Sequence, residues 1–270
     1  MSEAVRPGAL AAPARLAVGL RVAVFARLLA LQASWNHQRM QNLGLLVCLM
    51  PWLRARPRDP ERDRLFCRRY FEFFNTNPYL AGYVVGGLLR LETEREDAGG
   101  LPRGQAQVFR DSLARAFASL GDQLFWLGLR PTVALAGCVL ALTGQAWPVV
   151  GLGAAVAAGQ LAWRWHALGR GYAAGYDIVG LLGDPRWHRA IAGAKRAVRV
   201  LAGLAAGWLL RHAWEGSAQV GAAPGAFVAV VVVALALPAV VRRRWAGEFL
   251  VLATGLLALL LAFALGPKGS

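Results

Sequence analysis

Three short stretches of the chain place amide and carboxylate side chains among aromatic and apolar neighbours. The first covers residues 35–44 and reads WNHQRMQNLG. On a helix, Trp35, Gln38 and Asn42 would share one face, because positions three and seven apart lie on the same side. Amides both donate and accept hydrogen bonds, which suits a ligand rich in hydroxyl groups. We therefore take Trp35, Gln41 and Asn42 as candidate ligand contacts; the alternative is that these amides cap or bridge helices.

The second stretch, residues 70–79, reads YFEFFNTNPY and combines five aromatic rings with two amides. Ring faces suit the C–H edges of a sugar and amides suit its hydroxyls, so Asn75 and Asn77 are candidate contacts. The same residues also fit a helix C-terminus followed by an Asn/Pro turn. The local pattern by itself favours the turn.

The third stretch, residues 121–131, reads GDQLFWLGLRP and holds a carboxylate in an apolar setting. If the stretch is helical, Asp122, Trp126 and Arg130 lie roughly on one side. A carboxylate in such surroundings is costly unless it is paired, which makes Asp122 a candidate ligand contact. The structural alternatives are an ion pair with Arg130 or a cap at a helix N-terminus. Pro131 should end or kink the helix.

A fourth, glycine-rich stretch covers residues 169–177 and reads GRGYAAGYD. It resembles a phosphate-binding loop, but no strand precedes it and no Gly-Lys-Ser/Thr follows, so nucleotide binding is not expected. The spacing of Gly171 and Gly175 instead predicts close packing between helices.

Signatures of enzyme chemistry are missing from the sequence. There is no Gly-x-Ser-x-Gly elbow, and the histidines are scattered without the spacing of a metal site. The three cysteines are expected to be small buried hydrophobes. We therefore expect no catalytic residue, no metal and no cofactor on this chain. The residues concerned are His37, His166, His188, His212, Cys48, Cys67 and Cys138.

The composition favours a membrane protein over a soluble one. Apolar residues make up 57% of the chain and charged residues 17%, with a mean hydropathy of +0.42. In a typical soluble domain about 25% of residues are charged. The formal net charge is +15. In so apolar a chain this charge fits contact with anionic membrane lipids better than with nucleic acid, for which no binding module is visible.

The distribution of charge divides the chain into three parts. Residues 1–30 form a basic N-terminal segment, which precedes a membrane domain over the rest of the chain. Ten of the fifteen acidic residues lie between Asp59 and Asp122. The membrane domain therefore has a mixed first half at 31–130 that bears the motifs, and an apolar second half at 131–270.

Two apolar runs near the C-terminus, at 224–241 and 249–265, have the length of membrane spans, which take about 17–25 residues. The arginines at 242–244 between them should stay in the cytoplasm, which would place the C-terminus outside. Shorter, Gly- and Pro-punctuated runs are either re-entrant segments or ordinary bundle helices. The predicted fold class is an all-α membrane protein, a polytopic helical bundle with short or broken helices. The shorter runs are 132–142, 147–163 and 198–210.

Taken in order, the four stretches resemble the motifs of one protein family. The patterns W-N-x-x-x-M-Q-x-x-G, E-F-F-N-T-x-P, G-D-x-x-F-W-x-x-x-R-P and G-Y-x-x-G-x-D-I-V are those of the IID component of mannose/fructose/sorbose-type sugar phosphotransferase systems. Each motif is weak alone, whereas four in the right order are a specific signal. The resemblance runs from about Leu31 to the C-terminus. The motifs stand here at 35–44, 72–78, 121–131 and 171–179.

The resemblance implies a multi-pass subunit of the bacterial inner membrane that pairs with a IIC subunit to form a hexose-translocating permease. The phosphorylated histidines of such a system lie on separate IIA and IIB proteins, and IIB phosphorylates the sugar as it arrives inside. Complexes of this family are similar to elevator transporters and assemble as trimers of IIC–IID heterodimers. The resemblance implies no phosphorylated residue on this chain.

One segment departs from the family pattern. A G-P-L-A-G stretch usually precedes the third motif, whereas residues 112–120 read SLARAFASL, and Gln123 stands in place of a proline. A more regular helix is therefore expected here. If the usual stretch serves substrate movement, the alternative function is a regulatory or scaffold subunit of an incomplete phosphotransferase system, without sugar transport.

Overall fold

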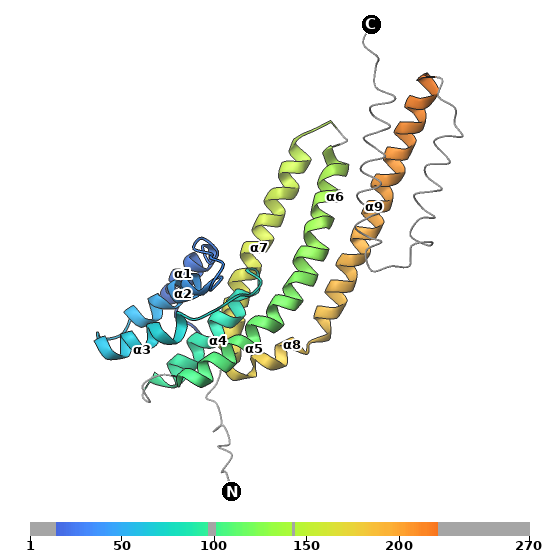
Figure 1. Ribbon diagram of the computed structural model, residues 1–270. Coiled ribbons are helices and arrows are strands. Elements are labelled where there is room, and N and C mark those ends of the chain that lie inside the picture. The colour runs from blue at the N-terminus through green and yellow to red at the C-terminus, as the bar shows by residue number, and fades with distance from the viewer. Residues whose placement is uncertain (1–14, 97–100, 142–143, 221–270) are drawn as a thin grey trace. The chain divides into compact units, whose positions relative to one another are not determined.

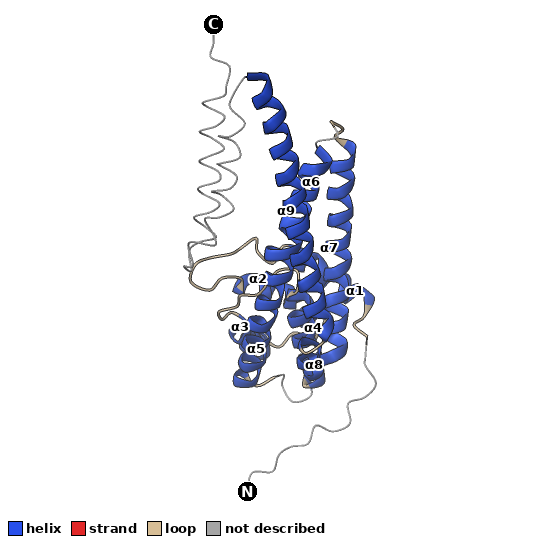
Figure 2. Ribbon diagram, turned by 90° about the vertical axis from the view of Figure 1, so that its right-hand side faces the viewer, coloured by secondary structure: helices blue, strands red, loops and turns tan. Residues whose placement is uncertain are grey.

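The computed structural model describes residues 15–96, 101–141 and 144–220. Within these ranges the regular elements are helices, joined by short loops that contain two isolated bridges (Figures 1 and 2). This confirms the predicted all-α class. In chain order the elements are α1 (Val18–Leu29), α2 (Asn42–Arg54), α3 (Pro60–Tyr70), α4 (Ala81–Glu94), α5 (Arg103–Gly121), the π-helix η2 (Asp122–Leu129), α6 (Arg130–Ala141), α7 (Trp147–Ala174), the 3-10 helix η3 (Gly175–Asp177), α8 (Ile178–Leu182) and α9 (Pro185–Val220).

The chain divides into two compact units, Met1–Leu201 and Ala202–Ser270. All packing described below belongs to the first unit. The spans predicted at 224–241 and 249–265, and the arginines at 242–244, lie outside the described residues. The predicted position of the C-terminus lies outside them as well.

Helices α1 and α2 pack closely because a glycine lies between them. A β-carbon on Gly44 of α2 would overlap the carbonyl of Leu31, just after α1. Helix α1 also contacts α7: the Arg21 guanidinium donates to the Trp165 carbonyl at 2.8 Å and lies over the Trp165 ring. The described part of the basic segment 1–30 is thus packed into the same unit as the helices that follow.

Helix α4 crosses α7 at the centre of the unit, and glycines line the crossing on both sides. A β-carbon on Gly86 would lie 2.6 Å from the Tyr172 nitrogen, and one on Gly171 would overlap the backbone of Tyr83. The predicted helix packing through Gly171 is therefore confirmed. Gly175 has a different role: its φ of 51° ends α7, a conformation that favours glycine.

Buried ionic groups connect α3, α4 and the beginning of α5. The Glu92 side chain is fully buried. Its carboxylate accepts from the Tyr70 hydroxyl at 2.5 Å and from Arg69 at 3.3 Å. The backbone nitrogen of Leu101 also donates to it, at 3.3 Å. A buried carboxylate is tolerated when its oxygens are satisfied in this way.

The third motif lies in the middle of one continuous helix, Arg103–Ala141, made of α5, η2 and α6. Pro131 neither ends nor breaks it. Proline cannot donate to the carbonyl four residues earlier, and the π-helical turns that precede Pro131 take up this mismatch. Of the described helices, this one alone is long and apolar enough to cross a membrane.

Helices α6 and α7 run side by side as a hairpin (Figure 1). Residues 132–141 and 147–163 lie in these two helices, and 198–210 lies in α9. The re-entrant and the bundle-helix alternatives both stay predictions. Helix α6 has no buried residue. For that reason Cys138 is exposed and the prediction of a buried cysteine is wrong there, whereas Cys48 is buried as expected.

Candidate functional site

The first motif forms a tight turn before α2 rather than a helix. The backbone nitrogens of Asn36 and Met40 donate to each other's carbonyl oxygens, at 3.1 and 2.9 Å. The Asn36 side chain accepts from the Arg39 nitrogen at 2.8 Å, and Met40 has a φ of 55°. The proposed common helical face of Trp35, Gln38 and Asn42 is therefore wrong, because the helix begins only at Asn42.

Hydrogen bonds of Gln41 connect this turn to the second motif. Its side-chain amide donates to the Thr76 carbonyl at 3.0 Å and accepts from the Thr76 nitrogen at 3.1 Å. Its backbone nitrogen donates to the Phe74 carbonyl at 2.8 Å. Gln41 and Thr76 are 2% and 3% exposed. The Gln41 amide therefore supplies the hydrogen bonds that the buried N–H and C=O groups of Thr76 need, as a neighbouring strand would.

The second motif is the turn that the local pattern favours. Helix α3 ends at Tyr70, and the Asn77 side chain accepts from the Tyr79 nitrogen at 3.1 Å. The Asn77 amide also donates to Oδ1 of Asp122 at 3.0 Å. The Thr76 hydroxyl donates to the Ala114 carbonyl on α5 at 3.0 Å. These bonds hold the turn against the junction of α5 and η2.

The predicted site residues fall into two groups. Gln41 bonds to Thr76, and the next residue of the chain, Asn77, bonds to Asp122, so three of the predicted residues meet at this turn. Asn75 is exposed on the same turn. Asn42 is buried and accepts from the Asn36 amide at 3.3 Å. Trp35 is half-exposed, and its ring contact is with His37.

Asp122 and Arg130 do not form the expected ion pair. Among the described residues, Asp122 bonds to Asn77, while the Arg130 guanidinium lies 4.5 Å from the centre of the Trp126 ring. The two residues are eight apart, which is about two helical turns, whereas side chains on one helix meet when they are three or four residues apart. Asp122 is not a cap either, because the helix continues through it. Its exposed carboxylate keeps one oxygen for a further donor.

An aromatic cavity of about 480 Å³ lies between η2, α6 and α7. Asn77 and Asp122 do not line it, but its wall includes Tyr79 and Leu124, each two residues along the chain from one of them. Tyr79 stacks on Phe125 with ring centres 4.4 Å apart, and Trp163 meets Phe125 edge-on. Gln160 and Arg130 supply polar groups to the wall. The size is that of a small-molecule site. No local pattern pointed to Gln160 or Trp163, because both lie in α7 outside the four motifs.

The chain matches one protein family over most of its length. The match covers residues 17–212, and the family is described as the mannose/fructose/sorbose family IID component of the phosphotransferase system (PTS). The mannose-specific EIID component of Escherichia coli K12 is 33% identical over 157 residues, which is 58% of this chain and 56% of that protein. The sorbose-specific EIID component of Lacticaseibacillus casei is 31% identical over 148 residues, 55% of this chain and 52% of that one. The matched part thus spans little more than half the length of these relatives.

Solved structures with the same fold are also membrane proteins. A chain in the cryo-EM structure of the mannose transporter ManYZ with microcin E492 is 30% identical, covers 70% of both chains and has a TM-score of 0.56. A second structure, titled as that of a membrane protein, is 30% identical with a TM-score of 0.63, over 73% of this chain and 71% of that one. The chain therefore belongs to the IID component family of the mannose/fructose/sorbose phosphotransferase systems and is an all-α membrane protein.

Proposed function

We propose that this chain is the IID half of a sugar permease of the inner membrane, and that it passes a hexose to IIB for phosphorylation. Family membership and the mannose transporter among the similar structures support a transport role. The observation that carries the site is the bond between Asn77 and Asp122 beside an aromatic cavity. A carboxylate with a free oxygen next to stacked rings suits a ligand with hydroxyl and C–H faces.

Each candidate residue has a distinct role in this proposal. Asp122 accepts from sugar hydroxyls, and the exposed Asn75 both accepts from them and donates to them. Asn77 holds the Asp122 carboxylate in place through its hydrogen bond and is itself a contact of the sugar. Gln41 and Asn42 are buried and position the turns, with Trp35 at the outer edge. Polar groups in fixed geometry would select among hexoses, because a sugar that leaves one of them unpaired binds less tightly.

The partner in this proposal is a IIC membrane subunit, in a trimer of heterodimers with an elevator-like movement. The hairpin of α6 and α7 supports a partner, because it exposes large apolar residues in the single chain, including Trp147, Val150 and Leu161. Such faces mark contacts with other proteins or lipid. The chain should copurify with IIC in equal amount. A stable monodisperse monomer without IIC would contradict this.

The orientation of the chain is part of the same proposal. The arginines at 242–244 should lie in the cytoplasm and Ser270 outside. A reporter fused after Ser270 that is active only in the cytoplasm would overturn this orientation.

Replacing Asp122 with Asn tests the site, because it keeps the shape and the bond to Asn77 and removes the charge. Uptake of the sugar by the reconstituted IIC–IID complex should fall at least tenfold, with complex assembly unchanged. Arg115→Gln is the matched control, since it removes a charge from an exposed position of the same continuous helix, outside the cavity wall. Equal uptake by wild type and Asp122→Asn would refute a role of Asp122 in sugar contact.

A regulatory or scaffold subunit is the second candidate, and one observation favours it. The departing segment 112–120 lies within α5, which runs as a regular helix to Gly121. If sugar passage needs a broken helix at this place, this chain lacks it. A complex of the wild-type chain with IIC that assembles fully but transports no hexose would identify this function.

A further inference from the structure

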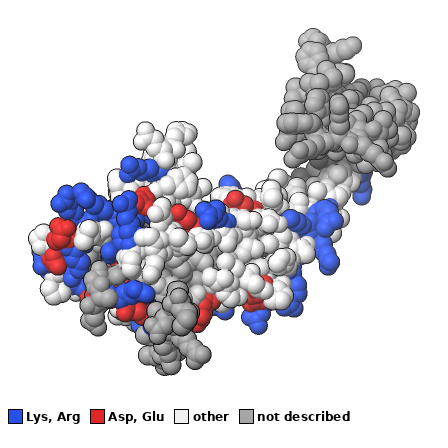
Figure 3. Space-filling view, turned by 60° about the horizontal axis from the view of Figure 1, so that its bottom comes forward, with Lys and Arg blue, Asp and Glu red and all other residues white. Residues whose placement is uncertain are grey.

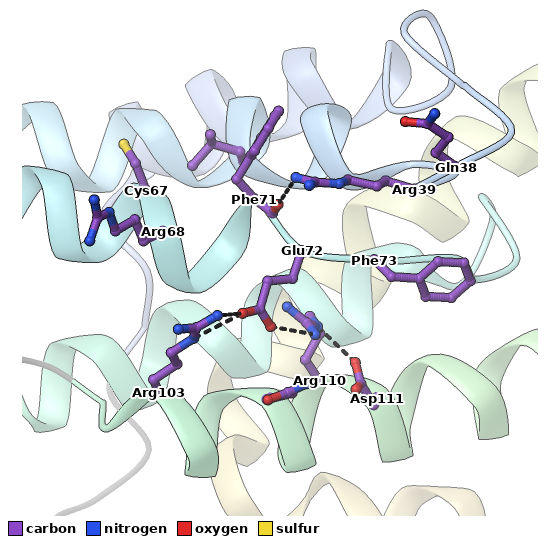
Figure 4. Close-up of a pocket in the computed structure, with 12 residues that line it drawn as sticks. Gln38, Arg39, Cys67, Arg68, Phe71, Glu72, Phe73, Arg103, Arg110 and Asp111 are labelled. Atoms are coloured by element: carbon purple, nitrogen blue, oxygen red, sulfur yellow. Dashed lines mark hydrogen bonds and ion pairs between the residues drawn. The ribbon is translucent and has the colours of Figure 1, made fainter.

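A cleft of about 800 Å³ lies between the turn at Gln38–Arg39, the C-terminal end of α3 and the first turns of α5. It is separate from the polar cluster around Asp122. Figure 3 shows basic side chains gathered at the end of the unit that carries α1 to α3. Figure 4 shows the cleft itself, with Glu72 pointing from the loop after α3 toward α5.

The carboxylates of the cleft are already neutralised by arginines. Arg103 and Arg110 both contact Glu72, and the nearly buried Arg110 also bonds Asp111 at 2.8 Å. Arg110 is 2% exposed and donates in addition to the Arg69 carbonyl at 3.2 Å. These groups form a rigid, roughly neutral floor.

Two further arginines of the cleft have no carboxylate partner within the described part of the chain. Arg39 donates to the Phe71 carbonyl at 3.1 Å and lies 5.3 Å from the centre of the Phe71 ring. Arg68 is exposed and has no hydrogen bond or ion pair to any described residue. The cleft therefore offers two cationic groups to an anion from outside.

The same cleft has an apolar wall, formed by Leu46, Cys67, Phe71 and Phe73. Phe71 and Phe73 are 42% and 53% exposed. The wall continues along α2, where Leu43 and Val47 are exposed on the same face as Leu46. A free anion would not need this apolar surface, whereas a phospholipid carries an anionic group and apolar chains in one molecule.

We propose that this cleft binds an anionic phospholipid, whose phosphate lies between Arg39 and Arg68 and whose acyl chains cover Phe71, Phe73 and the exposed face of α2. Arginine and aromatic side chains are the residues that meet headgroups at the membrane interface. The site does not depend on sugar transport; it requires only that the chain lies in a membrane.

The test compares lipids that differ only in headgroup charge. The full chain, with the membrane partner that copurifies, is extracted in a neutral detergent and titrated with palmitoyl-oleoyl phosphatidylglycerol or with the phosphatidylcholine of the same chains. Bound lipid is counted by native mass spectrometry. Wild type should bind phosphatidylglycerol more tightly. The double substitution Arg39→Gln/Arg68→Gln should reduce that affinity about thirtyfold, because each arginine near an anionic headgroup contributes roughly fivefold.

Three controls keep the result specific. Arg189→Gln/Arg196→Gln removes the same charge from exposed positions on α9 and should leave phosphatidylglycerol binding unchanged. Arg39→Lys/Arg68→Lys keeps the charge and should keep most of the affinity. Phe71→Ser/Phe73→Ser should weaken both lipids, since both share the acyl chains.

Several outcomes would overturn the proposal. One is equal binding of phosphatidylglycerol by wild type and the Arg39/Arg68 glutamine variant. Another is displacement of the lipid by an equal concentration of inorganic phosphate, which would make the cleft a site for free anions. A third is loss of binding of the soluble IIB protein in the same variant with lipid binding intact, which would make the cleft a protein interface. The readout contains no sugar, so its failure leaves the transport proposal untouched.

Discussion

The side chain of Asn77 occupies the space where any residue other than glycine at position 121 would place its β-carbon. A β-carbon built on Gly121 would overlap the side chain of Asn77, whose amide reaches past it to Asp122 at 3.0 Å. The glycine of the third motif and the second asparagine of the second motif are thus two halves of one contact. Each motif requires the other.

Replacing Gly121 with Ala should therefore push Asn77 out of place. We expect a loss of about 1–3 kcal/mol in stability, which is typical of overpacking at a close contact. Sugar uptake by the IIC–IID complex should fall together with the midpoint of thermal unfolding. Gly137→Ala is the control on the same continuous helix, because nothing lies within 4 Å of a β-carbon there. Equal thermal midpoints and equal uptake for the two alanine variants would contradict a close contact between Gly121 and Asn77.

Replacing Gln41 with Leu should lower the stability of the fold, although the exposed surface stays the same. The change removes both partners of the Thr76 backbone, at 3.0 and 3.1 Å, and leaves these buried groups unpaired. The expected cost is about 2–4 kcal/mol, since each unpaired buried polar group costs about 1–3 kcal/mol. Gln38→Leu, at an exposed position of the same turn, should change thermal unfolding little. A Gln41→Leu protein as stable as wild type would remove Gln41 from its positioning role.

The crossing of α4 and α7 should tolerate no side chain at Gly86. Its β-carbon would overlap the Leu168 carbonyl, which belongs to the helix backbone and cannot move aside alone. We expect Gly86→Ala to lower the thermal midpoint and the yield of folded protein. Gly159→Ala on α7, where a β-carbon would meet nothing within 4 Å, should leave both unchanged or improved.

Stability should depend on pH through Glu72, which lies in the loop between α3 and α4. Partial burial pushes the pKa of Glu72 upward, but hydrogen bonds and charge pairing with Arg103 and Arg110 outweigh it and hold the pKa below its ordinary value. A depressed pKa means that the folded state favours the carboxylate. This stabilisation is therefore present above the unfolded pKa of about 4.3 and is lost as the pH falls through the lower folded value.

Thermal unfolding of wild type and Glu72→Gln across pH measures this effect. The difference between the two proteins should be largest near neutral pH and should shrink below the ordinary pKa of glutamate. Asp177→Asn, at an exposed position on η3, controls for the loss of one carboxylate. A difference that grows toward acid pH would reverse the sign of the argument.

The sequence predicted the class of fold, the turn at the second motif and the packing of Gly171, because each depends on local chemistry. It could not predict how Gln41 is used, since an amide in a polar stretch fits a ligand contact and a backbone contact equally well. The helix expected through Trp35 failed at Met40, whose positive φ no local rule anticipates. The aromatic cavity was missed because Trp163 comes from a distant helix and carries no motif of its own.

The π-helical segment η2 also bears on how chain length can vary in this family. A π-turn closes its hydrogen bond over five residues instead of four, so it holds one residue more than the α-helical turn it replaces. Loss of one residue within Asp122–Leu129 could therefore be absorbed by a return to α-helical bonding. The side chains of α5 and α6 would then keep their present directions around the helix axis. The same loss within α5 would rotate every later side chain of the helix by about 100°. Single-residue length differences among relatives should accordingly gather in η2, and a shorter relative would carry its aspartate on a straight helix.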